Sequence, residues 1–363
     1  MAKHSILAGL MILAACCPAF SQQTKILTAE KHNEYGLIYT LPVTALEVEV
    51  TAVREVRTAG PYYRYAKKYT GSDNVVKENS ESWTIKSVSV RPYGIPNPDQ
   101  RYLMQLKSGA LTYIGVDADN MLLSINHEPS AQKASTPLPK PQIEGEKLAD
   151  NEYLQYVDED FIASQSSAKQ AQMLAENLME IRDAKVSLTR GTADNMPSDG
   201  KQLELMLNSL AHQEKALTAA FLGNITRETV VRRFSYVPVE NARNVLFRLS
   251  DFEGFVAPDD YSGEPVYINV HITDEGALPV DAKGEEKKLP KDAVAYCVPG
   301  AAKFTISYMG RDLFSAEYEV AQFGVNFGLN PAIFTDKKSP SYAVFDPATG
   351  ALKEIGVMKE GGE

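Results

Sequence analysis

The sequence predicts an α+β fold in which two β-rich domains have an antiparallel helical hairpin inserted between them. Residues 22–128 and 226–363 contain runs in which apolar and polar residues alternate, as half-buried strands do. Residues 151–225 instead place apolar residues at a period of about 3.6, which is typical of amphipathic helices. A linker rich in Pro, Lys and small polar residues, 129–150, joins the first β-rich domain to the helical hairpin.

The first β-rich domain alternates most clearly in the stretch GLIYTLPVTALEVEVTAVREVR. Leu46, Val48 and Val50 alternate there with Glu47 and Glu49. We therefore expect apolar side chains on one face of a sheet and carboxylates on the other. Further strands are predicted at WTIKSVSV, RYLMQLK, ALTYIGV and MLLSIN.

A short helix is predicted to interrupt this domain within GPYYRYAKKYTG. Pro61 suits a first helical turn and Gly71 suits the position just after a helix. Tyr62, Tyr65 and Tyr69 fall on one face of that helix. We expect these three tyrosines to pack the helix onto the sheet.

The other side of the same helix carries Tyr63, Arg64 and Lys67, which are predicted to face solvent. They are candidate binding residues, because a basic patch with interleaved aromatic rings can stack on nucleic acid or sugar. The alternative is an ordinary solvated helix face.

The helical hairpin is predicted from two apolar stripes joined by the turn-rich segment TRGTADNMPSDGKQ. The first stripe consists of Ala171, Leu174, Leu178, Ile181 and Leu188. The second consists of Leu203, Leu207, Leu210, Leu217 and Phe221. Asp199 and Gln202 have the spacing of a capping box, so the second helix should begin after Asp199.

The C-terminal β-rich domain ends in a predicted hairpin, SYAVFDPATGALKEIGV, that resembles the earlier stretch TYIGVDADNMLLSIN. Both have an apolar strand, a turn that begins with Asp, and an apolar return strand. The likeness has two explanations, an internal duplication or a coincidence between two common hairpins.

The N-terminus predicts export, with residues 1–21 as a signal peptide. A basic start at Lys3 is followed by a short apolar run, SILAGLMILAA, which suits a signal core and is too short to span a bilayer as a helix. We expect cleavage after Ser21, which leaves Gln22 first in a mature chain of the periplasm or cell envelope. The alternative is lipidation of Cys16, which would anchor the chain to the outer membrane.

Charge, cysteine content and the lengths of the apolar runs limit the partners, disulfides and membrane spans that the mature chain can have. Removing residues 1–21 takes away one basic residue, so 36 basic and 47 acidic residues remain, a net charge of −11. This charge argues against nucleic acid as a main partner. Only Cys297 remains after cleavage, in the apolar run AVAYCVPG, so we expect a buried cysteine and no disulfide within the chain. No second apolar run reaches transmembrane length, so the mature chain should have no transmembrane helix.

No catalytic, cofactor or metal signature stands out. The histidines do not form a zincin motif, and His212 is expected to be a solvated residue of the second helix. The adjacent carboxylates Asp259 and Asp260 lie in the predicted loop APDDYSGEP. A pair of acids about 5 to 10 Å apart can hydrolyse a glycoside, so these two are candidate residues for a hydrolase.

Several separated motifs together resemble a known family. They are YGLIYTLPVTALEVEVTA, GPYYRYAKKYTG, MPSDGKQLELMLNSLAHQEKALTAAFLG, VAQFG and FDPATGALKEI, in that order. The chain is similar, from about residue 30 to its end, to the uncharacterised family called domain of unknown function 4831. One departure is KKYTG, where a Leu is expected before the Gly. The resemblance implies a secreted envelope protein of a Bacteroidetes-type, Gram-negative bacterium, and it implies no catalytic residue because the family has no assigned activity.

The sequence thus predicts an exported cell-envelope protein that acts as a non-enzymatic binding or scaffolding module. Its expected partner is an envelope protein or a glycan. The alternative is a loop-carboxylate hydrolase that acts on glycan or peptide. A long exposed edge strand would favour the first function, since such an edge can accept a partner's strand. Two acids converging on a pocket would favour the second.

Overall fold

The structure is a computed structural model that describes residues 23–26, 36–105, 113–129, 135–288, 290, 292–336 and 338–358. The predicted processing residues Cys16, Ser21 and Gln22 lie outside the described residues. Within these ranges, no helix combines the length and the apolar character that crossing a bilayer requires.

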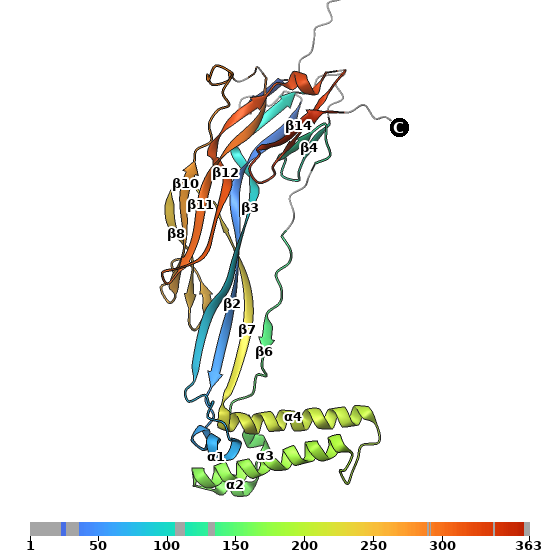
Figure 1. The fold of residues 1–363 in the computed structure, drawn as a ribbon, viewed down its shortest axis with the longest axis vertical. Helices are drawn as coiled ribbons and strands as arrows, with labels where there is room; N and C mark the ends of the chain where they lie inside the picture. Colours follow the sequence, from blue (N-terminus) through green and yellow to red (C-terminus); the bar gives the residue numbers. More distant parts are fainter. Residues whose placement is uncertain are drawn as a thin grey trace, which may run out of the picture.

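The molecule is elongated, with strands at one end, a long ribbon in the middle and helices at the other end (Figure 1). Strands make up 46% and helices 22% of the described residues, which confirms the predicted β-rich α+β class. The two long helices pack against each other, as the hairpin prediction required.

The first sheet supplies the ribbon, and its strand order is β1-β3-β2-β7-β6. Its strands are β1 (Gln23–Ile26), β2 (Leu37–Thr58), β3 (Ser80–Gln105), β6 (Gln142–Glu144) and β7 (Asn224–Tyr236). Every pair in it is antiparallel. Strands of the two predicted β-rich segments share this sheet, because β7 pairs with β2 along its whole length.

The second sheet packs on the first and forms a sandwich with it, in the strand order β12-β11-β10-β8-β9. Its strands are β8 (Ala242–Ser250), β9 (Gly254–Val256), β10 (Glu264–Asp274), β11 (Val294–Tyr308) and β12 (Arg311–Leu329). The predicted apolar face of β2 fills the core between the sheets, since Leu46, Val48 and Val50 are fully buried. They pack with Phe247 and Phe304 of the second sheet.

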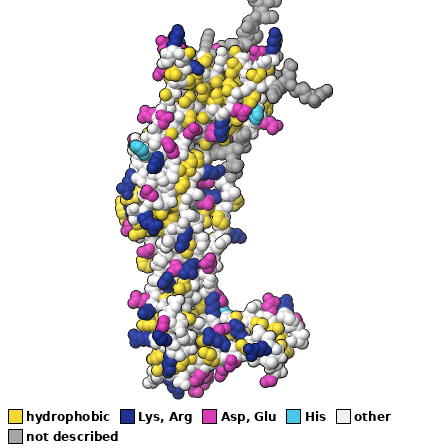
Figure 2. Space-filling model, in the orientation of Figure 1, with side chains coloured by type: hydrophobic (Ala, Val, Ile, Leu, Met, Phe, Trp, Pro, Cys, Tyr) yellow, Lys and Arg dark blue, Asp and Glu magenta, His cyan; other side chains and the backbone are white. Residues whose placement is uncertain are grey.

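The opposite face of the ribbon carries the predicted carboxylates, paired with arginines. Glu49 accepts hydrogen bonds from Arg233 at 2.7 Å, and Glu47 pairs with Arg91 at 3.2 Å. Lys, Arg, Asp and Glu side chains alternate along the ribbon and over the helical end (Figure 2). Each exposed pair of this kind adds little stability, so burial on the other face holds the ribbon.

A third, smaller sheet covers the end of the sandwich farthest from the helices (Figure 1), in the order β14-β13-β5-β4. Its strands are β4 (Ile114–Val116), β5 (Leu122–Ile125), β13 (Ser341–Phe345) and β14 (Leu352–Val357). The single-turn helix η3 (Pro331–Phe334) precedes β13. The two hairpins that resemble each other in sequence therefore lie side by side, joined by the pairing of β5 with β13.

Each of these hairpins is attached to a long strand in the same way. The amide of Thr40 in β2 donates to the carbonyl of Asn120 at 2.9 Å, and Thr40 forms a parallel bridge with Met121. The amide of Cys297 in β11 donates to the carbonyl of Gly350 at 3.0 Å, and Cys297 bridges in parallel with Ala351. The two attachments occupy the matching stretches YTLP and YCVP.

The long strands repeat the same irregularity at these stretches. In the hairpin of β2 and β3, the pairing partner jumps from Arg101 to Pro96 as the chain passes the YTLP stretch. In the hairpin of β11 and β12, it jumps from Val325 to Val320 at the YCVP stretch. In each long hairpin, a third strand pairs with the first strand of the hairpin: β7 pairs with β2, and β10 pairs with β11. The likeness of the two terminal hairpins thus extends to a whole strand arrangement, which a coincidence of turn sequences does not explain.

Within the described residues, the helical end contains four short helices and two long ones. They are η1 (Tyr63–Tyr65), α1 (Ala66–Thr70), η2 (Glu152–Tyr156), α2 (Glu159–Ala163), α3 (Ser167–Arg190) and α4 (Gly200–Leu222). Asp199 caps α4 as predicted, by accepting from the amide of Lys201 at 2.7 Å, but no hydrogen bond between the described residues Asp199 and Gln202 completes the capping box. Gly191 ends α3 with a φ of 70°, a left-handed conformation that favours glycine. The apolar stripes meet in a core that includes Leu174 and Leu217.

The predicted helix at residues 61–70 forms and stops at Gly71, but its tyrosines pack elsewhere than expected. Tyr62 is 7% exposed, and its ring lies 6.2 Å from the ring of Phe161 in α2. Tyr69 lies 6.0 Å from Phe221 in α4. The tyrosines pack on the helices rather than on the sheet, because the ribbon carries this helix beyond the sandwich to the helical end (Figure 1).

Candidate binding site

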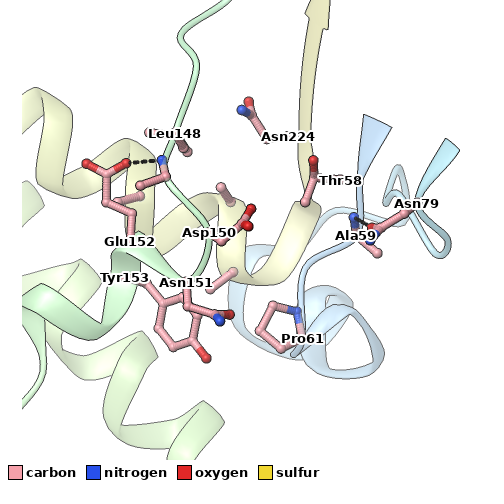
Figure 3. Close-up of a pocket in the computed structure, with 14 residues that line it drawn as sticks. Thr58, Ala59, Pro61, Asn79, Leu148, Asp150, Asn151, Glu152, Tyr153 and Asn224 are labelled. Atoms are coloured by element: carbon pink, nitrogen blue, oxygen red, sulfur yellow. Dashed lines mark hydrogen bonds between the residues drawn. The ribbon is translucent and has the colours of Figure 1, made fainter. Parts of the chain in front are cut away.

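A cavity of about 330 Å³ lies where the ribbon meets the helical end. It is bounded by the end of β2, the start of β7, the linker before η2 and the last turns of α4. Figure 3 shows Asp150, Asn151 and Asn224 around one opening, with Thr58 and Pro61 on the side of the strands. The volume is within the range of small-molecule sites.

Small residues allow the chain segments around this cavity to approach one another. A Cβ atom on Gly60 would lie 2.5 Å from the carbonyl oxygen of Ala220, so only glycine fits there. Ala216, Ala219 and Ala220 of α4 line the floor of the cavity. The glycine and the alanines thus let the start of the loop after β2 pack directly on the backbone of α4.

The polar groups of the cavity are partly committed to holding its walls. The side-chain oxygen of Asn79 accepts from the amide of Ala59 at 2.7 Å (Figure 3). The side-chain nitrogen of Asn224 donates to the carbonyl of Glu146 at 3.0 Å. Each amide side chain thus uses one of its two polar atoms for the fold and leaves the other without a partner among the described residues.

His212 braces the linker against α4 next to this cavity. Its Nδ1 is hydrogen-bonded to Glu146 and its Nε2 to Glu152, and Lys215 pairs with Glu146 at 3.2 Å. Hydrogen bonds to Glu146 and Glu152 raise the pKa of His212. Hydrogen bonds from His212 and Lys215 lower the pKa of Glu146. His212 lies on α4 with 36% of its side chain exposed, and both of its ring nitrogens are bonded, a pairing that the sequence did not predict.

This brace should loosen as the pH rises. Since the folded-state pKa of His212 is raised, the stability it contributes is present below its ordinary value of about 6.5 and is lost as the pH rises through the raised value. We expect faster hydrogen–deuterium exchange in residues 144–153 above that value, after correction for the intrinsic exchange rate. His212→Gln, which cannot titrate, should show no such step. An identical step in this variant would contradict the role of His212.

The candidate residues of the predicted basic patch lie on the outer face of η1 and α1. The Arg64 guanidinium lies 5.8 Å from the centre of the Tyr63 ring, and Lys67 pairs with Asp73 at 2.9 Å. None of these residues lines the cavity. The patch is a partly exposed surface, and its role in binding remains a prediction.

The candidate acids Asp259 and Asp260 lie in the loop between β9 and β10, on the second sheet and away from the cavity. The Asp260 carboxylate accepts from the amide of Ser262 at 2.9 Å, and this bond lowers the pKa of Asp260. Arg248 holds the same loop by donating to the carbonyls of Pro258 and Gly263. Asp260 therefore has a turn-forming role. Among the residues that the structure describes, no group of three or more His, Cys, Asp and Glu could hold a metal ion.

Cys297 is buried as predicted, with 2% of its surface exposed. Burial raises the pKa of its thiol to about 12. The reactive thiolate is therefore scarce at neutral pH. We expect iodoacetamide to leave the native protein unmodified at Cys297 and to alkylate it fully in denaturant, as measured by intact mass. Rapid alkylation of the native protein would contradict this burial.

Comparison with known proteins identifies a family without an activity. No curated protein and no solved structure matches the chain. The model of the family described as Domain of unknown function (DUF4831) matches residues 35–353, which include both faces of the sandwich, the ribbon and the helical end. The chain belongs to this family, in agreement with the motifs that resemble it.

Proposed function

We propose that this protein is an exported cell-envelope protein that acts as a non-enzymatic binding module, with the cavity at its helical end as the binding site. The observation that carries this proposal is the difference between the two repeated strand arrangements. The second long hairpin, β11 and β12, turns through Met309 and Gly310. The first, β2 and β3, carries η1 and α1 in its connection and ends at the cavity.

The helical end is thus an insertion with a hydrophobic core of its own. The helical core draws on residues 62–222, whereas the two sandwich cores draw on none of the inserted residues 59–79 or 145–223. Function commonly resides in segments added to a rigid scaffold. The cavity lies within such an addition.

Of the ionisable groups beside the cavity, Glu152 and His212 are committed to the fold, which leaves the Asp150 carboxylate as a single free acid of the lining rather than one of two converging acids. Glu152 uses one carboxylate oxygen for His212 and the other to accept from the amide of Ala149 at 2.7 Å. His212 uses both ring nitrogens. A general acid or base needs an atom that reaches the substrate, and these atoms are committed to the fold. The hydrolase alternative has less support, because Asp260 is committed in the same way to its own loop.

An edge strand adds support for a scaffolding role. The stretch Ser80–Val90 of β3 pairs with β2, and no other described strand pairs with it. An edge of this kind can accept a strand from a partner protein.

The export part of the proposal comes from the predicted leader, residues 1–21, and from the family resemblance to envelope proteins of Bacteroidetes-type bacteria. Mass spectrometry of the mature N-terminus, from protein purified with and without detergent, tests it. A chain that begins at Gln22 supports cleavage and release. An acylated Cys16 supports the anchored alternative, and an intact leader on a cytosolic product would overturn export.

Photo-crosslinking in intact cells tests the binding site. A photoreactive amino acid replaces Asn151, at the cavity, or Asp183, an exposed residue of α3 away from it. We expect envelope adducts from position 151 that are missing from position 183. The same adducts from both positions, or none from position 151, would contradict a binding site at the cavity.

A further inference from the structure

We propose that the cavity at the helical end binds a neutral saccharide. This inference rests on the proposed function and names the chemical class of its ligand. It comes from three properties of the lining residues: unpaired polar atoms, an apolar floor, and the sign of the charge.

The first property is a set of polar atoms without a partner among the described residues. The carboxylate of Asp150, the side-chain amide of Asn151 and the hydroxyl of Thr58 make no hydrogen bond or ion pair there. Asn79 and Asn224 each keep one amide atom unused, a donor in Asn79 and an acceptor in Asn224. The cavity therefore offers both donors and acceptors, and a hydroxyl group can serve as either.

The second property is the apolar floor. Pro61 places an apolar ring at the side of the cavity (Figure 3), and Ala219 is the most exposed of the three α4 alanines in the lining. A sugar ring has C–H groups on its faces and hydroxyls around its rim. A face of the ring would pack on Pro61 and Ala219 while the rim reaches the amides and the carboxylate, which satisfies both kinds of surface.

The third property is charge. The lining contains no Lys or Arg, and its two acids are Asp150 and Glu152. Glu152 is hydrogen-bonded to His212, so Asp150 is the acid of the lining without a partner among the described residues. A carboxylate repels phosphorylated and other anionic ligands, and it accepts strong hydrogen bonds from hydroxyl groups. A neutral polyhydroxy ligand fits this site better than a nucleotide or a phosphate.

Titration calorimetry with the full mature chain tests the proposal. The probes are glucose, galactose, mannose, N-acetylglucosamine and their β-linked disaccharides, with glucose 6-phosphate and putrescine as charged comparisons. We expect saturable binding of at least one neutral sugar. Asp150→Asn should weaken that binding at least about ten-fold, because a neutral amide oxygen accepts a weaker hydrogen bond from a hydroxyl than a carboxylate does. Asp183→Asn, the same chemical change on the exposed face of α3, should leave it unchanged.

The variant should remain folded, because Asp150 has no partner within the described chain to lose. Its thermal unfolding midpoint should equal that of the unchanged protein. The proposal is overturned if no neutral sugar binds, if Asp150→Asn binds as well as the unchanged protein, or if only putrescine or the phosphate binds. Crosslinks from position 151 without sugar binding would leave the binding module standing and reject the saccharide.

Discussion

Replacing Phe247 with alanine should lower the free energy of unfolding by about 4 kcal/mol, the typical cost of removing a buried phenyl ring. Phe247 has none of its surface exposed. Its ring stacks on Phe234 of the first sheet at 4.4 Å and lies 5.2 Å from Phe255. Its removal would open a cavity between the two sheets at the point where they hold each other.

Urea denaturation followed by tryptophan fluorescence measures this effect, because the one tryptophan, Trp83, lies against Phe255 in the same core. Phe252→Ala is the matched control, since this ring is 78% exposed. The control should change stability by no more than about 0.5 kcal/mol. Equal effects of the two substitutions would show that the core does not depend on Phe247.

Thr44→Val should destabilise the protein by about 3 kcal/mol, although it changes the size of the side chain little. Thr44 is fully buried where the three sheets meet. Its hydroxyl accepts from the amide of Ala321 at 2.9 Å and donates to the carbonyl of Ala348 at 2.9 Å. Valine leaves both groups buried and unsatisfied, at a cost of about 1–3 kcal/mol for each.

Thr44→Ser separates the hydroxyl from the methyl group. It keeps both hydrogen bonds and removes one methyl, so it should cost only about 1 kcal/mol. Denaturation of the two variants under the same conditions compares the contributions. A serine variant that loses as much stability as the valine variant would show that packing, rather than hydrogen bonding, holds this junction.

Local patterns predicted the elements of this fold well. The alternation of Leu46, Val48 and Val50 with glutamates identified both faces of β2, and Asp199 marked the start of α4. Alternation and capping depend on residues a few positions apart, so they can be read from the sequence. The packing partner of Tyr62 could not be read from the sequence, because alternation does not show how far the ribbon projects beyond the sandwich.

The pairing of distant strands and the candidate site were not predictable in this way. Asn224 reaches the cavity because β7 pairs with β2 through Thr58, more than a hundred residues earlier in the chain. Glu146 and Glu152 meet His212 across the linker, with no local spacing to mark them. One signal in the sequence did point to a contact between distant segments, namely the likeness of the two terminal hairpins. In the structure, both hairpins are attached to long strands in the same way, at Thr40 and at Cys297.

The separation of the cores has a consequence for how this family diversifies. A substitution around the cavity leaves the sandwich cores untouched, because they share no residue with the helical core. Lineages can therefore exchange Asp150, Asn151 and their neighbours while the strands stay intact. Family members should thus differ most in the helical end, and a change of preferred ligand should require few other changes in the chain.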